Sequence, residues 1–133
     1  MKTLIAFVTA AVTLSANLAA AQTAAEFRSQ FARHAINSLC EQEMNLLGQF
    51  IGKRAAGMSR DQLLVQIDDY VTAKQQPAEL EQLHVLMLNT AFTGTKLTPA
   101  DFQGDKPSPH AQAIVAKGHI ACVQYMNTLN SDR

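Results

Sequence analysis

Hydrophobic positions recur at intervals of three and four residues along most of the chain, which is the spacing of helices buried on one face. Between residues 24 and 56 this pattern predicts an amphipathic helix, long enough to bend or break near Gly48 or Gly52 and ending at Gly57. Its apolar positions are Phe27, Phe31, Ala35, Leu39, Leu46, Leu47, Phe50 and Ile51.

Two further helices are predicted in the middle of the chain. Ser59, followed three positions later by Gln62, matches a capping box and predicts a second helix that ends near Gln76. Pro77 suits the first turn of a third helix, which ends at Gly94. This third helix is apolar over a wide arc, so we expect it to be the most buried of the domain.

The last part of the chain carries two compact helix-start patterns. Thr98-Pro99-Ala100-Asp101 predicts a short helix, because Gly104 follows closely. Ser108-Pro109 predicts a final helix that runs to about Leu129. No segment alternates as a half-buried strand does. The predicted fold class is therefore all-α, a compact bundle of four main helices plus one short helix.

The first 21 residues have the layout of a secretory signal peptide. Lys2 precedes an apolar stretch from Leu4 to Leu14, and the small residues Ala19-Ala20-Ala21 predict cleavage before Gln22. The competing interpretation is an N-terminal membrane anchor, but the apolar stretch is short for a bilayer span and lacks a basic flank. We expect a periplasmic or secreted protein.

Cleavage would leave residues 22–133, which we expect to form a single helical domain. The whole chain of 133 residues has a formal net charge of zero, and 17% of its residues are charged. This balance gives no electrostatic case for nucleic acid as a partner. No later apolar run reaches the length of a transmembrane helix, so no internal membrane span is expected.

Cys40 and Cys122 are the two cysteines of the chain. In an exported protein they have one intramolecular pairing, a disulfide that links the first and last helices. A metal pair and a reactive thiol are the alternatives. Cysteines this far apart, without a second local ligand, match no metal-site spacing.

Few residues of the sequence suggest a catalytic or metal-binding site. Glu81 and His84 have the spacing used in carboxylate-bridged metal sites, but only a few carboxylates could complete such a site: Glu41, Glu43, Asp68 and Asp69. We therefore expect no metal or other cofactor, and a surface or boundary position for His84. His119 lies beside the apolar stripe of the last helix, so partial burial is expected.

The segment 93–109 is the least regular part of the predicted domain, and binding surfaces concentrate in such loops. The alternative is a plain connector with Phe102 packed under the bundle, which is slightly favoured. The candidate partner-binding residues are Lys96, Leu97, Phe102, Asp105, Lys106 and His110.

The layout resembles that of known exported proteins. It combines an early and a late cysteine, the segment Arg54-Ala-Ala-Gly57-Met-Ser59 and a Leu97-Thr98-Pro99 turn. It is similar to the small two-cysteine exported proteins of proteobacteria, most of them without an assigned function. More distantly, it resembles the periplasmic helical immunity proteins that neutralise cell-wall amidases delivered by type VI secretion. The resemblance implies protein binding without catalysis and carries over no functional residue.

No nucleophile and base can be assembled from the pattern, so an enzyme is not expected. The leading hypothesis is an exported, non-enzymatic helical protein that binds another envelope or secreted protein, as an inhibitor or immunity protein would. The alternatives are a helical bundle that binds a small ligand or metal, and a chaperone-like protein of envelope stress.

Overall fold

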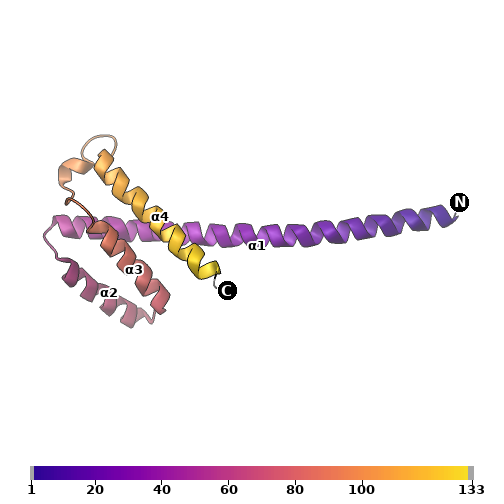
Figure 1. Ribbon diagram of the computed structural model, residues 1–133, viewed down its shortest axis with the longest axis horizontal. Coiled ribbons are helices and arrows are strands. Elements are labelled where there is room, and N and C mark those ends of the chain that lie inside the picture. Colours follow the sequence, from indigo (N-terminus) through magenta and orange to yellow (C-terminus); the bar gives the residue numbers. More distant parts are fainter. Residues whose placement is uncertain (1, 132–133) are drawn as a thin grey trace. The chain divides into compact units, whose positions relative to one another are not determined.

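The computed structural model describes residues 2–131, with side chains for Glu26, Ser29, Gln30 and residues 32–131. In this part of the chain the elements are α1 (Lys2–Ala55), α2 (Arg60–Lys74), α3 (Ala78–Ala91), the 3-10 helix η1 (Pro99–Phe102) and α4 (Pro109–Ser131), with no strand. The predicted all-α bundle of four main helices plus one short helix is confirmed (Figure 1).

The chain divides into two units, Met1–Ala35 and Ile36–Arg133. In the first unit the backbone is helical from Lys2, and the Arg33 guanidinium donates to the Ser29 hydroxyl at 3.2 Å. The side chains of residues 1–25 lie outside the described ones, so the signal peptide and its cleavage site stay predictions. Within the described residues, no helix is both long and apolar enough to cross a bilayer.

The second unit contains the hydrophobic core. There α3 packs against both α2 and α4, and the C-terminal part of α1, from Ile36 to Ala55, completes the bundle (Figure 1). Helix α3 is buried over a wide arc, as expected. The fully buried side chains with the largest volumes come from all four helices and are Cys40, Leu47, Leu63, Leu83, Met87, Leu88 and Cys122.

Helix α1 runs unbroken through Gly48 and Gly52, so the break expected near these glycines does not occur. The two glycines are exposed, whereas Leu47, Phe50 and Ile51 beside them are buried. Each glycine costs a helix about 1 kcal/mol relative to alanine, and burial of one large apolar side chain stabilises it by a comparable or larger amount. The buried stripe therefore keeps the helix continuous.

The predicted end of the first helix and the predicted start of the second agree with the structure, whereas α1 is helical from Lys2 rather than from residue 24. Gly57 has φ of +98°, and its neighbour Met58 donates its backbone N–H to the Lys53 carbonyl at 3.0 Å, which closes α1. The Ser59 hydroxyl accepts from the backbone N–H of Gln62, whose side chain accepts from the Ser59 N–H in return. Both halves of the predicted capping box are present.

The Cys40–Cys122 disulfide links α1 to α4, as predicted from the cysteine count. Both cysteines are completely buried, and their Cα atoms are 5.8 Å apart. The bridge closes a loop that contains α2, α3 and η1. It fixes the two helices that lie furthest apart in the sequence of this unit.

Candidate functional site

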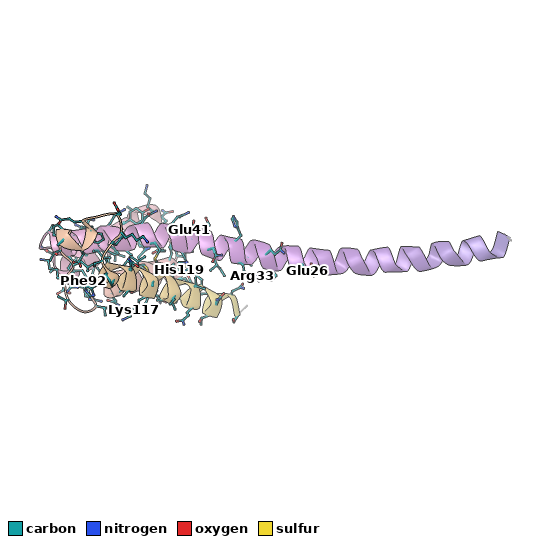
Figure 2. The ribbon with its side chains drawn as sticks, turned by 90° about the horizontal axis from the view of Figure 1, so that it is seen from above. Glu26, Arg33, Glu41, Phe92, Lys117 and His119 are labelled. Carbon is teal, nitrogen blue, oxygen red and sulfur yellow. A yellow bond between two sulfur atoms is a disulfide. The ribbon has the colours of Figure 1, made fainter. Side chains whose placement is uncertain are left out.

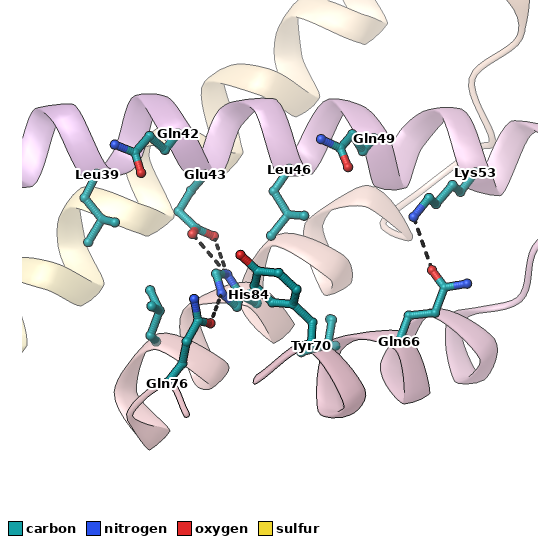
Figure 3. Close-up of a pocket in the computed structure, with 12 residues that line it drawn as sticks. Leu39, Gln42, Glu43, Leu46, Gln49, Lys53, Gln66, Tyr70, Gln76 and His84 are labelled. Atoms are coloured by element: carbon teal, nitrogen blue, oxygen red, sulfur yellow. Dashed lines mark hydrogen bonds and ion pairs between the residues drawn. The ribbon is translucent and has the colours of Figure 1, made fainter. Parts of the chain in front are cut away.

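A cleft of about 560 Å³ lies between α1 and the hairpin formed by α2 and α3 (Figure 3). From α1 it is lined by Leu39, Gln42, Glu43, Leu46, Gln49 and Lys53, and from the hairpin by Gln66, Ile67, Tyr70, Gln76, Leu80 and His84. All of these residues belong to the second unit. Leucines alternate with hydrogen-bonding side chains along the α1 wall of the cleft, so this wall presents apolar and polar contacts to a ligand.

A buried, hydrogen-bonded pair of a histidine and a carboxylate forms part of the lining. Nδ1 of His84 lies 3.0 Å from each carboxylate oxygen of Glu43, and the two residues are only 8% and 4% exposed. Buried charged groups are stable only when paired and hydrogen-bonded. This pair joins α1 to α3 across the cleft, and it corrects the expectation of a surface or boundary histidine at position 84.

The second ring nitrogen of His84 is held from the α2–α3 connection. Its Nε2 lies 3.0 Å from Oε1 of Gln76, so both ring nitrogens are in hydrogen-bond contact with a side-chain oxygen. The preceding residue, Gln75, adopts a left-handed conformation with φ of 52°, which is costly for a residue other than glycine. That turn ends α2 and directs Gln76 toward the histidine (Figure 3).

Polar side chains face each other on opposite sides of the cleft. Lys53 of α1 donates to Oε1 of Gln66 of α2 at 3.2 Å, and Gln42 and Gln49 stand on the same face of α1 (Figure 3). The ring of Tyr70, which is half exposed, lies edge-on to His84 with centroids 6.3 Å apart. The cleft thus offers both hydrogen-bond donors and acceptors beside the buried Glu43–His84 pair.

In the structure His84 is bonded to Glu43 and Gln76 and not to Glu81, with which its spacing in the sequence suggests a metal pair. The pKa of Glu81 is raised, chiefly because its carboxyl shares a hydrogen bond with Asp68 of α2; burial and the Asp68 charge add to the rise, and His84 opposes it. Among the residues described, no three His, Cys, Asp or Glu side chains gather closely enough to hold a metal ion.

The residues predicted on the 93–109 segment and at its end are only partly brought together on the surface. Lys96, Asp105, Lys106 and His110 are exposed, and Phe102 is 51% exposed rather than packed under the bundle. Leu97, in contrast, is 3% exposed and belongs to the core, so it cannot contact a partner. His110 donates from Nε2 to the carbonyl of Thr95 at 3.0 Å.

Asp101 organises this segment. Its carboxylate accepts from the Thr98 backbone N–H at 2.8 Å and from the Ser108 hydroxyl at 2.7 Å, and these bonds lower its pKa. The Ser108 hydroxyl in turn accepts from the backbone N–H of Ala111 and begins α4. The segment is therefore a connector held by side-chain hydrogen bonds, with charged side chains exposed on it.

The other histidines do not contribute to the cleft. His34 and His119 are exposed, so the partial burial expected for His119 is wrong; His119 and Lys117 both belong to α4 (Figure 2).

A second cavity, of about 610 Å³, adjoins the cleft and is lined by Leu39, Pro77, Glu79, Leu80, Leu83, Met126 and Leu129. It shares Leu39 and Leu80 with the cleft, so the two spaces meet at these side chains. Except for Glu79 its lining is apolar. One end of the cleft thus borders a hydrophobic hollow between α1, α3 and α4, with Leu39 and Leu80 between the two spaces.

The sequence-based prediction missed Glu43 as a site residue, although a pattern marks it. Glu43 falls on the buried stripe of α1 between Cys40 and Leu47, where the helical spacing calls for an apolar residue. A carboxylate at such a position needs a partner. Its partner His84 lies 41 positions away, and no local pattern connects the two.

Comparison of the chain with family models, with curated proteins and with solved structures found no significant match.

Proposed function

We propose that the chain is an exported, non-enzymatic protein that binds a segment of a partner protein in the cleft between α1, α2 and α3. The observation that carries the proposal is the facing arrangement of glutamine side chains, with Gln42 and Gln49 on α1 opposite Gln66 and Gln76. A primary amide presents one acceptor and two donors, which match the N–H and C=O of a peptide group. The leucines between them supply contacts for apolar side chains.

The contacts of His84 in the cleft favour a binding function over a catalytic one. Both ring nitrogens of His84 are engaged, Nδ1 with Glu43 and Nε2 with Gln76. An imidazole used as a general base must present one nitrogen to the substrate. In this arrangement the histidine holds α1 and α3 at a fixed separation, and a rigid cleft loses less entropy when it binds a partner.

The Cys40–Cys122 disulfide supports the export part of the proposal, because structural disulfides persist in oxidising compartments. The predicted signal peptide is consistent with it. The partner is then another envelope or secreted protein. An inhibitor or immunity protein is the form of this function that the resemblance implies, since such a protein acts by covering part of an enzyme.

A site-specific photo-crosslinking experiment tests the proposal. A photoreactive amino acid is placed in the full chain at Gln49 in the cleft, at Phe102 on η1, or at Gln124 on the exposed face of α4. The variants are irradiated in envelope extract of the source cells, and the adducts are identified by mass spectrometry. We expect one defined adduct from Gln49 and none from Gln124.

The partner identified in this way is then purified and titrated against the protein. Gln49→Arg should weaken its binding by about tenfold or more, whereas the matched change Gln124→Arg should leave it unaltered. An adduct from Phe102 alone would place the interface on the 93–109 segment and overturn the proposal. Equal effects of the two arginine variants, or no adduct at any position, would overturn it as well.

A further inference from the structure

The cleft has two unlike ends. Leu39 and Lys53 mark them on α1 and are separated by fourteen positions, which is about 21 Å at 1.5 Å per helical residue (Figure 3). An extended chain advances about 3.4 Å per residue, so the cleft matches about six residues of extended peptide. On α1, Gln42 and Gln49 stand between these two ends.

The Leu39 end is hydrophobic. There Leu39 and Leu80 separate the cleft from the second cavity, whose lining also includes Met126 and Leu129. Its volume of about 610 Å³ is ample for a large aliphatic or aromatic side chain. A residue of that kind at one end of a bound segment would leave water and enter an apolar hollow, which favours binding.

The Lys53 end is cationic. The Lys53 ammonium uses one of its three donors on Gln66, at 3.2 Å, and two remain for a ligand. The other carboxylates that line the two spaces lie away from Lys53. Glu43 is paired with His84, and Glu79 lines the second cavity at the Leu39 end. A carboxylate on the ligand therefore finds its complementary charge at Lys53.

We propose, on the basis of the function proposed above, that the cleft binds an extended segment of about six residues with a large apolar side chain at the Leu39 end and a carboxylate at the Lys53 end. The central peptide groups of the segment exchange hydrogen bonds with Gln42 and Gln49, while Gln66 lies at the Lys53 end. The carboxylate is supplied either by an acidic side chain or by a free chain terminus.

Synthetic hexapeptides and the full chain with its disulfide intact test this proposal. The first peptide has leucine at its N-terminus, a Ser-Gly spacer and aspartate at its C-terminus, and the second has the reverse order. Both have blocked termini, and a third peptide has the first sequence with asparagine in place of aspartate and a free carboxyl terminus, which distinguishes the two sources of the carboxylate. Binding is followed by NMR chemical shifts of the glutamine side-chain amides. One chain direction should bind more tightly than the other.

The charge requirement is tested with a matched pair of lysine variants. Lys53→Gln should weaken binding of the preferred peptide by about tenfold, and Lys74→Gln, at an exposed position of α2 outside the cleft, should not. Replacing the peptide aspartate by asparagine should cause the same loss in the wild-type protein and no further loss in Lys53→Gln. Thermal unfolding of both variants verifies that they are folded.

Two results would overturn the inference. One is that no hexapeptide shifts the cleft glutamines; the other is that Lys53→Gln and Lys74→Gln bind alike. In either case an adduct from Gln49 in the crosslinking experiment would still support a partner in the cleft. The crosslinking result therefore separates a failure of the inferred peptide pattern from a failure of the proposed function.

Discussion

Gly118 of α4 lies directly against Leu47 of α1. A Cβ atom at position 118 would be 2.5 Å from Cδ2 of Leu47, which is closer than nonbonded carbon atoms approach. Leu47 is completely buried, so it has little room to move away. The glycine therefore lets two helices joined by the disulfide pack at short range.

This contact predicts opposite effects for the same substitution at two helical glycines. Gly118→Ala should destabilise the fold by about 1 kcal/mol, because overpacking outweighs the gain in helix propensity. Gly48→Ala should stabilise it by about 0.5–1 kcal/mol, since no atom lies within 4 Å of the new Cβ. Urea unfolding measures both. Equal shifts of the two midpoints would contradict the close packing.

The buried Glu43–His84 pair predicts a large loss of stability when one partner is removed. Glu43→Ala should lower the free energy of unfolding by about 3 kcal/mol, because it leaves the His84 ring buried without its partner. Glu41→Ala, at an exposed position of the same helix, is the control and should change stability by less than about 0.5 kcal/mol. The double variant with leucine at positions 43 and 84 should recover much of the loss.

Loss of the disulfide should destabilise the protein strongly. The bridge closes a loop with a sequence separation of 82 residues, for which chain entropy predicts a contribution of about 4.5 kcal/mol. Urea unfolding with and without a reductant measures it. Intact mass after alkylation of the native protein should show both thiols protected. Two alkylated cysteines in unreduced protein would exclude the bridge.

The hydrogen bonds of the Asp101 carboxylate that hold the 98–108 segment should weaken in acid. Its pKa is lowered by bonds from the Thr98 N–H and the Ser108 hydroxyl. A lowered pKa means that its contribution is present above the unfolded value, near 3.8, and is lost as pH falls through the folded value. Hydrogen exchange of the Thr98 amide should rise in Asp101→Asn at neutral pH, while Asp105→Asn, at an exposed position nearby, should leave it unchanged.

The contribution of Glu81 to stability should depend on pH in the opposite direction. Its pKa is raised by the hydrogen bond with Asp68, so the contact between α2 and α3 is favoured while Glu81 holds its proton and weakens as pH rises through the raised value. An NMR titration of the Glu81 carboxyl should give a pKa above the ordinary 4.5, and Asp68→Asn should lower it. Asp69→Asn is the control. An unchanged titration in Asp68→Asn would contradict the shared bond.

The positions of the helices could be predicted because they depend on residues close together in the sequence. The disulfide could be predicted because two cysteines have only one possible pairing. The box of Ser59 and Gln62 and the N-cap at Thr98 depend on residues within one turn, and two cysteines allow one bridge. The continuity of α1 through Gly48 could not be predicted, because buried residues from other helices decide it.

The cleft was beyond prediction for the same reason. Glu43, Gln66 and His84 come from three different helices, and only their packing brings them to one cavity. The loop prediction placed Leu97 with the exposed residues because charged neighbours surround it in sequence. Whether that leucine faces water or the core depends on how η1 folds back, which no local pattern specifies.

The covalent ring formed by Cys40 and Cys122 also determines what a protease can do to this protein. The exposed residues between α3 and α4 lie inside that ring, and loop tips of this kind are the preferred sites of nicking. One cut there would sever the polypeptide and leave the two pieces covalently attached, and every residue that lines the cleft would remain on the N-terminal piece. A nicked molecule should therefore migrate as one species until it is reduced, and it should retain its capacity to bind.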